Sequence, residues 1–499
     1  MFVRLLTALT LLVAYSANAS AADSAVLLIT AEELADAWRP FADWKTTTGR
    51  PTTIVTVEQA KAEFPADIVQ ESLRLCVRDH IDNHGTRWVL LGADCEPNGG
   101  GLVPGGHTTF HAQERRGIPT DIVYLSPTNW DADGDGRHGE FEDDRDAITY
   151  PDGSVGLGRV PVRTTEDVKA FTDKVIAYES DYPTGDFAKR MIYTCTEPSA
   201  YPKVMRSWDE YVSSAWDGKA DRYFAHKTPW DDEGKPGSHE LSANNLVELL
   251  NAGDYGKLHI HGHGFLPAWV LEGSMFTGKQ VGQLKNKNAY PLITTVSCFT
   301  GQYDAKRDPS IAERMIRQPN AGSVAIVAPV RTGKPHFAKR SDIRLMISEG
   351  KLDGTTMTMT NYWRHGLADE ATTGSATTGH ALMMAKADMA DDAKASLNFH
   401  LCVCELNLLG DPTLLMRSKP PTTPQLTVLQ SLPAGKATLA IRTDAPGATV
   451  TLSDGNDLYQ TATADKQGNA EFAFTASEEL TVGVYGNNLN AVTRKVQVN

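Results

Sequence analysis

After its first two dozen residues, the 499-residue sequence has no apolar run long enough to cross a lipid bilayer. Positive charge is also in deficit, because 48 Lys and Arg residues face 62 Asp and Glu residues, for a formal net charge of −14. Nucleic acids and anionic membranes select basic patches, so this balance argues against both as partners. Cysteine is scarce as well. Six cysteines are too few for a disulfide framework in a chain of this length, although a Cys76–Cys95 bridge stays open.

The one long apolar run lies at the N-terminus. Residues 1–21 combine Arg4, an apolar stretch from Leu5 to Tyr15, and small residues around Ala19. This is the pattern of a secretory signal peptide, and it is too short for a membrane-spanning helix. The mature protein is therefore expected to be exported from a bacterium, and to be secreted, periplasmic or held at the cell surface.

Strand and helix patterns alternate over most of the chain. Apolar runs such as "SAVLLIT", "TTIVTV" and "RWVLLGAD" are separated by segments with helical spacing, and the same rhythm returns after "SVGLGRVPV". Alternation of this kind predicts an α/β fold, with a parallel sheet covered by helices on both faces. We expect an N-terminal α/β subdomain over residues 22–185 and a second α/β subdomain over 186–418.

The pattern changes after "SKPPTTP", which has the composition of a linker. Short alternating segments such as "ATLAIRT", "AEFAFTA" and "LTVGVYG" follow, with turn signals every eight to twelve residues or so. Residues 419–499 are therefore predicted to form a small all-β sandwich.

The stretch "KLHIHGHG" carries three alternating histidines, His259, His261 and His263. In a strand all three side chains would point to one face, where imidazoles can bind zinc. Packing or hydrogen bonding inside the sheet is the simpler interpretation for His259 and His261. Two strand-like segments in this part of the chain end in reactive residues, one in His263-Gly264 and the other in Cys298. Because carboxyl ends of parallel strands face one crevice, thiol and imidazole are expected to meet there.

This pair suggests nucleophilic catalysis. The imidazole of His263 would activate the Cys298 thiol, whose thiolate attacks a carbonyl carbon. Glycines on both sides of His263 keep the backbone slim, so that the Gly264 amide is available to a developing oxyanion.

An apolar strand ending in His-Gly, followed by one ending in Ser-Cys, resembles the caspase-like cysteine peptidases. Within them, "GHG" followed by "SCFTG" is similar to the gingipain family. Further segments share the resemblance: "RWVLLGAD", "DADGDGRHGEFE", "GLGRVPVRTTEDVKAFTDKVIAYE" and "LNLLGDPTL", together covering about residues 24–416. The resemblance implies a caspase-like catalytic region, an immunoglobulin-like C-terminal sandwich, and protein or peptide substrates.

By the same resemblance, His263 is the catalytic histidine and Cys298 the nucleophile. The backbone amides of Gly264 and Cys298 would form the oxyanion hole. Gingipains usually carry an acidic residue just ahead of the "GR" strand, and here Ser154 stands near that place with Asp152 two residues earlier. The identity of a third catalytic residue is therefore open. The residue type accepted before the scissile bond is open as well: Arg331 and Lys334, after the next strand, would disfavour a basic residue if they lined that pocket, whereas the acidic residues of "TTED" could favour one.

The segment "DADGDGRHGEFE" predicts a calcium site. Asp131, Asp133, Asp135 and Glu142 fit the spacing of an EF-hand loop, with Gly136 at the sharp bend and the Arg137 carbonyl as a further ligand. The flanks lack the helices of a paired sensor hand, so a structural ion is expected. No organic cofactor is expected.

Two other functions compete with a peptidase. A metallohydrolase would use His259, His261 and His263 around zinc. A binding module could keep the fold without turnover. Neither the sequence pattern nor the composition fixes the oligomeric state.

Overall fold

The computed structural model describes residues 24–96, 101–108, 117–196, 216–224, 241–306, 308–333, 354–373, 376–456 and 458–499. The predicted signal peptide lies outside these residues. Within them, no helix combines the length and the apolar composition needed to span a membrane.

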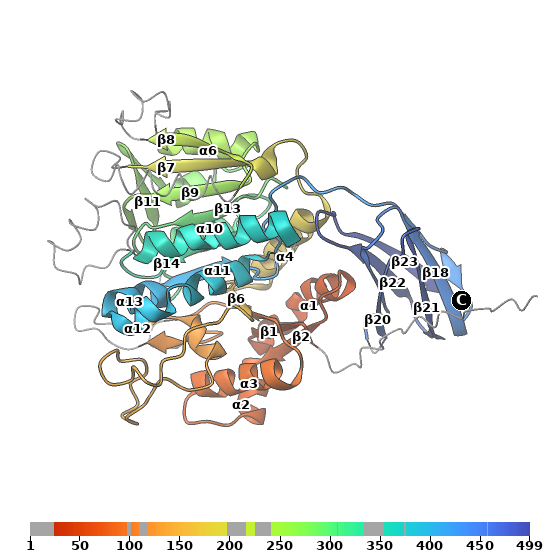
Figure 1. The fold of residues 1–499 in the computed structure, drawn as a ribbon, viewed down its shortest axis with the longest axis horizontal. Helices are drawn as coiled ribbons and strands as arrows, with labels where there is room; N and C mark the ends of the chain where they lie inside the picture. Colours follow the sequence, from red (N-terminus) through yellow and green to blue (C-terminus); the bar gives the residue numbers. More distant parts are fainter. Residues whose placement is uncertain are drawn as a thin grey trace, which may run out of the picture.

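The centre of the molecule is a ten-stranded sheet (Figure 1). Its strands, in spatial order, are β2 (Thr52–Thr56), β1 (Val26–Thr30), β3 (Trp88–Leu91), β6 (Gly156–Arg159), β15 (Leu406–Gly410), β14 (Ala325–Pro329), β13 (Leu292–Thr295), β9 (Lys257–His261), β7 (Arg190–Cys195) and β8 (Lys219–Phe224). Strands β1, β9, β14 and β15 are buried along their whole length. Burial on both faces explains why they read as continuous apolar runs in the sequence.

The sheet is parallel within each half but changes direction at one seam. β15 pairs antiparallel with β14, whereas the pairs on either side of this seam are parallel. The sequence rhythm predicted parallel strands and could not show this reversal. Its cause is the chain path: β15 begins at Leu406, beside Pro329 at the end of β14, so the chain re-enters the sheet at the edge from which it left.

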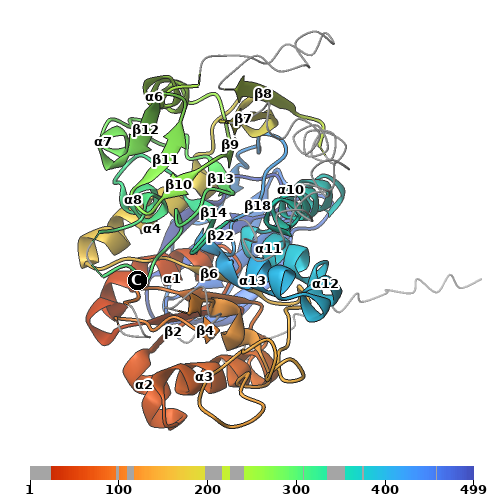
Figure 2. The same ribbon diagram turned by 90° about the vertical axis from the view of Figure 1, so that its left-hand side faces the viewer.

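Helices cover both faces of the sheet (Figures 1 and 2). One face carries α10 (Gly354–Thr373), α11 (Thr378–Ala387) and α13 (Leu397–Glu405), with α12 (Ala390–Ala395) beside them. The remaining α-helices among the described residues are α1 (Glu32–Thr47), α2 (Val57–Glu63), α3 (Val69–Asn83), α4 (Thr165–Ser180), α6 (Ala243–Ala252), α7 (Gly278–Val281) and α8 (Ile311–Arg317). Capping boxes start α4 at Thr164 and α8 at Ser310.

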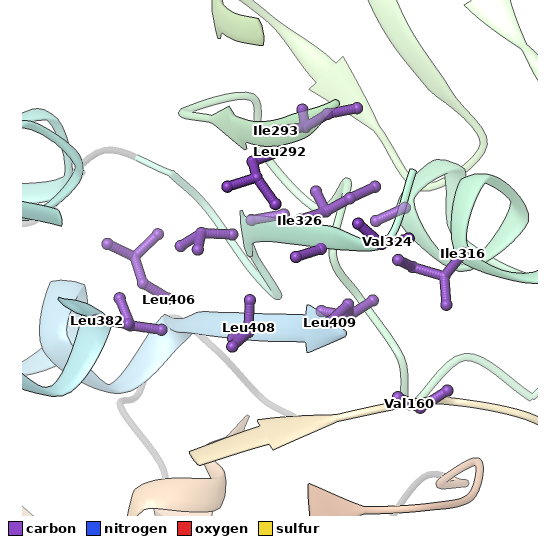
Figure 3. Close-up of a cluster of buried hydrophobic side chains, with 14 of the residues drawn as sticks. Val160, Leu292, Ile293, Ile316, Val324, Ile326, Leu382, Leu406, Leu408 and Leu409 are labelled. Carbon is purple, nitrogen blue, oxygen red and sulfur yellow. The ribbon is translucent and has the colours of Figure 1, made fainter. Parts of the chain in front are cut away.

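One hydrophobic core joins the two predicted α/β subdomains. Figure 3 shows its centre, where Ile326 of β14 and Leu408 of β15 lie between Leu292 of β13 and Val160, which follows β6. Side chains from both sides of residue 185 therefore share the same buried layer.

The C-terminal strands form two sheets around a separate core (Figure 1). They are β16 (Leu426–Thr427), β17 (Ser431–Leu432), β18 (Gly435–Thr443), β19 (Thr449–Ser453), β20 (Tyr459–Thr463), β21 (Asn469–Ala476), β22 (Leu480–Tyr485) and β23 (Val492–Val498). The predicted alternation is present in β18, where Leu439, Ile441 and Thr443 are buried and the residues between them are exposed. These strands lie at the end of the molecule opposite to the carboxyl ends of β7 and β8, away from the edge that carries Cys298.

A buried ionic cluster ties the C-terminal strands to the α/β part. Glu179 of α4 accepts hydrogen bonds from Lys45 Nζ at 2.8 Å and Arg50 Nη1 at 2.9 Å, and Lys45 also contacts Asp411 at 2.6 Å. Burial disfavours a charged carboxylate, but the two cations hold the pKa of Glu179 below its ordinary value. On the C-terminal side, the Arg50 guanidinium lies 4.3 Å from the centre of the Tyr485 ring.

We predict that Glu179→Gln lowers the free energy of unfolding by about 3 kcal/mol, because it removes the carboxylate that pairs with buried Arg50 and one of the two that pair with buried Lys45. Urea unfolding followed by fluorescence measures the change. The matched control is Lys169→Gln on the same helix, which breaks an exposed pair with Asp173 and should cost less than about 1 kcal/mol. Equal losses in the two variants would contradict the prediction.

Candidate active site

The site is organised by two neighbouring parallel strands. β9 and β13 pair so that Ile260 lies beside Thr295, and the Val296 amide donates to the Ile260 carbonyl at 3.1 Å. His263 and Cys298 each lie three residues beyond that last pair. The common register therefore carries the imidazole-bearing and thiol-bearing segments to the same edge of the sheet, as the sequence predicted.

Gly264 makes the contact between the two segments. A Cβ atom at this position would lie 2.5 Å from Thr300 Cγ2, 2.7 Å from Ser297 Cβ and 3.0 Å from the Cys298 carbonyl oxygen. Real side chains do not tolerate such distances, so only glycine fits. The backbone after His263 is thus packed directly against the turn that holds Cys298.

The turn after Cys298 is strained and held by hydrogen bonds. Phe299 has a left-handed backbone, with φ of 62°, which costs a residue with a side chain about 1–2 kcal/mol. Its amide donates to the Arg331 carbonyl at 2.7 Å, and the Gly301 amide donates to Pro329 at 2.9 Å. Cys298 is partly exposed in this turn, whereas the other five cysteines are buried and free of disulfides. The open Cys76–Cys95 bridge is therefore absent, and burial raises the pKa of both thiols to about 12.

Two buried cations anchor the segment that follows Cys298. Arg331 donates to both carboxylate oxygens of Asp304, at 2.8 and 2.6 Å, and is 2% exposed. The sequence left open whether Arg331 and Lys334 line a substrate pocket. The Arg331 side chain is instead bound in this buried pair, and Lys334 lies outside the described residues. Arg159 lies 4.9 Å from the Tyr303 ring and donates to Asp121 at 2.8 and 2.9 Å.

The other two histidines of "HIHGHG" lie inside the sheet. His259 shares a hydrogen bond of 2.7 Å with Thr294 Oγ1, which also accepts from Trp363 Nε1 at 2.8 Å. His261 ends β9 and is buried, whereas His263 lies past the strand end and is exposed. Among the described residues, the one group of three or more ligand-type side chains whose atoms come within 4.8 Å of one another is acidic, so the three histidines do not converge on a zinc position.

That acidic group lies in the loop predicted to bind calcium. It consists of Asp131, Asp133 and the buried Asp144. The structure thus brings together two of the predicted ligands and adds Asp144, which the spacing pattern did not identify. Asp135 and Glu142 are exposed and outside the group, and Arg137 is exposed with its Nη2 atom 2.7 Å from Glu140.

Asp152 and Ser154 form an exposed turn ahead of β6, in which the Ser154 hydroxyl donates to Asp152 at 2.6 Å. Four strand spacings separate β6 from β9 in the sheet order, or about 19 Å at the usual interstrand distance. Hydrogen bonding of Asp152 pulls its own pKa down, with Ser154 as the main donor. This turn is therefore remote from His263.

A family model described as peptidase family C25 matches residues 19–417. The chain belongs to peptidase family C25. This confirms the resemblance drawn from the sequence motifs. Gingipain R2 of Porphyromonas gingivalis is 23% identical over 95% of this chain, and gingipain R1 of the same organism is 22% identical over 95%. The chain spans 57% of the length of that gingipain R2 and 42% of that gingipain R1.

A solved structure shows the same fold. The crystal structure of the Arg-specific cysteine proteinase gingipain R superposes with a TM-score of 0.68 at 21% identity, covering 96% of this chain and 98% of that chain. The mixed α/β fold with its large sheet is therefore the fold of that gingipain structure.

Some parts of this region had no readable sequence signal. Asp144 lies two residues beyond the end of the EF-hand spacing pattern at Glu142, and the buried Asp304–Arg331 pair joins positions 27 residues apart. A small hairpin sheet beside His263 was also missed, because its strands are only two to four residues long.

We predict that His259 makes the protein acid-labile. Burial lowers its pKa to about 3, below the value of about 6.5 in an unfolded chain. The unfolded state therefore takes up the proton first as the pH falls, and stability is lost between about pH 6.5 and pH 3. From pH 7 to pH 5 the loss from this group is about 2 kcal/mol.

Urea unfolding of His259→Gln at both pH values tests this. The variant should lose about 2 kcal/mol less than the parent over that interval. Thr294→Val is the control, since it removes the hydrogen-bond partner but keeps the histidine, and its pH dependence should match the parent. Identical pH dependence in parent and His259→Gln would refute the assignment.

Proposed function

We propose that this protein is an exported cysteine endopeptidase that hydrolyses peptide bonds through Cys298 and His263. The observation that carries the proposal is the shared register of β9 and β13, with Gly264 packed on the Cys298 turn. Cys298 is also the one cysteine of the six that solvent can reach. Membership of family C25 gives this pair its chemical context.

The proposed reaction has two halves. His263 accepts the Cys298 proton, and the thiolate attacks the carbonyl carbon of the scissile bond. The imidazolium then protonates the leaving amine as the C–N bond breaks, leaving a thioester on Cys298. In the second half His263 takes a proton from water, the resulting hydroxide attacks the thioester, and the acid product and free thiol are released.

The negative oxygen formed in each half requires donors. We assign this role to the backbone amides of Gly264 and Cys298. The hairpin pairing supports Gly264: Gly264 pairs with Trp269, and the hydrogen bond of 3.0 Å runs from the Val270 amide to the His263 carbonyl. In antiparallel pairing this pattern directs the Gly264 amide away from its partner strand. That amide is therefore available to a substrate oxygen.

The remaining inferences concern the rest of the chain. We infer that the catalytic region is caspase-like and that the two C-terminal sheets form an immunoglobulin-like domain, as the motif resemblance implies. The N-terminal pattern supports export, to the medium, the periplasm or the cell surface. Peptide or protein substrates follow from the chemistry of the proposed dyad.

The test is cleavage of a mixed peptide library by the purified mature protein, with cleavage sites determined by mass spectrometry. Cys298→Ala should reduce the rate by more than about a thousandfold, because it removes the nucleophile. Cys195→Ala is the matched control: this buried thiol lies beside His261 on the neighbouring strand, and its loss should leave cleavage intact. The residue preceding each cleaved bond reads out the specificity in the same experiment.

Each competing function predicts a different result. Equal cleavage by parent and Cys298→Ala would sink the proposed mechanism, and inhibition by a zinc chelator with calcium present would favour a metallohydrolase. No cleavage, together with no labelling of Cys298 by a thiol-directed peptide electrophile, would indicate a binding module without turnover.

We further propose that the loop 131–144 binds calcium for structural purposes. Atoms within 4.8 Å of one another suit an ion that sits 2.3–2.6 Å or so from each oxygen. The loop bends at Gly134 and Gly136, with φ of 77° and 83°, and both amides donate to Asp131. The donor set is all oxygen, which suits calcium. Asp131, Asp133 and Asp144 would hold the ion, with Asp135, Glu142 and the Arg137 carbonyl as the further ligands that the sequence pattern suggests.

Calcium at about 1 mM should stabilise the parent by about 1.4 kcal/mol if the dissociation constant is on the order of 10⁻⁴ M. Asp144→Asn should abolish the effect in a thermal unfolding experiment. Asp143→Asn, an exposed neighbour outside the group, should keep it. Glu142→Gln tests which ligand set is correct, because the EF-hand spacing pattern includes Glu142 and the observed group does not. An unchanged calcium response in Asp144→Asn would refute the assignment of Asp144 as a ligand.

A further inference from the structure

An exposed apolar patch lies beside His263. Only four large apolar side chains are classed as exposed in the described part of the chain, and two of them, Phe265 at 57% and Met275 at 51%, belong to one small sheet. This sheet consists of β10 (Gly264–Phe265), β11 (Ala268–Leu271) and β12 (Ser274–Thr277), and it lies beside the main sheet near β9 and β13 (Figure 2).

The pairing register shows which side chains share a face. Gly264, Trp269 and Phe276 lie side by side, and the latter two are fully buried, so this is the inner face. Side chains alternate along a strand, so the neighbouring positions point outward. Val270 pairs with Met275, and its amide donates to the carbonyl of His263, which stands opposite to it in the hairpin. Residues opposite each other point to the same face of a sheet, so Val270 and Met275 lie on the face that carries His263. We call Phe265, Val270 and Met275 the outer patch.

The outer patch therefore continues the face that carries the imidazole. Phe265 is two residues beyond His263 on that face, about 6.6 Å along an extended strand. In the described part of the chain the other two exposed large apolar side chains, Ile68 and Leu429, belong to other segments, so the pair beside His263 marks a binding surface.

The proposed reaction determines which part of the substrate lies beside the outer patch. A general acid must come within hydrogen-bonding distance of the atom that it protonates, which is the leaving nitrogen in this reaction. The chain on the C-terminal side of the scissile bond starts at that nitrogen, so it starts beside His263. Its first side chains are then within reach of Phe265.

We propose that the outer patch binds the substrate segment on the C-terminal side of the scissile bond and selects apolar residues there. The proposal rests on the peptidase function proposed above and adds a specificity determinant to it. The occupant is a peptide in extended conformation whose first or second side chain after the cleaved bond packs against Phe265.

The test uses two peptides that share the sequence before the cleaved bond and carry either Leu-Leu or Ala-Ala after it. The parent should favour the Leu-Leu peptide about fivefold in kcat/KM, from partial burial of the larger side chains. In Phe265→Ser this ratio should fall to about one, and in Phe265→Leu it should stay close to that of the parent. Leu429→Ser, which removes a 60% exposed apolar side chain from the C-terminal domain, is the matched control and should keep the parent ratio.

A methyl ester of the shared acyl segment separates the two proposals, because it has no residues after the cleaved bond. Absence of ester hydrolysis and of Cys298 labelling would overturn the peptidase function itself. Ester hydrolysis that depends on Cys298, with a Leu-Leu preference that is missing or is unchanged in Phe265→Ser, would overturn only the role of the patch. A parent that sediments as a dimer and a Phe265→Ser protein that sediments as a monomer would assign the patch to self-association instead.

Discussion

The parallel register of β9 and β13 is the constraint on which the site depends. The two strands are separated by 30 residues of chain between His261 and Leu292, and hydrogen bonds between them bring their carboxyl ends to the same edge of the sheet. The close approach at Gly264 then requires that no side chain stands between them. A shift of the register by one residue would turn every side chain to the opposite face, so the fold could not tolerate it without losing both core and site.

The antiparallel seam between β14 and β15 has a second consequence. Because the strand direction changes there, the carboxyl ends of β9, β13 and β14 share an edge with the amino ends of β15 and β6. The loop after Cys298 lies against residues of both halves: Tyr303 packs on Arg159 from β6, and Asp304 binds Arg331 after β14. A loop that contains a strained residue is thereby held by buried charge pairs, whose loss would leave uncompensated cations.

The sequence predicted those features that repeat locally. The strands and helices of the α/β part, the alternation in the C-terminal strands, and the arrival of the segments that carry His263 and Cys298 at one edge of the sheet all follow from periodicity and from the behaviour of parallel strand ends. The direction of β15, the partner of Arg331 and the position of Asp144 depend on contacts between distant segments, which leave no period in the chain. The alternating histidines show where a local pattern fails. Alternate side chains share a face only within a strand, and β9 ends at His261, before His263.

A thiol nucleophile also changes what the site needs from its surroundings. A serine hydroxyl must be deprotonated during attack, so its histidine benefits from a carboxylate that orients it and stabilises its charge. A thiol has a much lower intrinsic pKa, and its thiolate is a strong nucleophile at neutral pH. A Cys–His pair can therefore react without a carboxylate, provided that the backbone orients the imidazole. Here the His263 carbonyl accepts from the Val270 amide, and Gly264 packs on the Cys298 turn, so the backbone is fixed on both sides of the histidine. In the mechanism that we propose, this fixed backbone limits where the imidazole can lie.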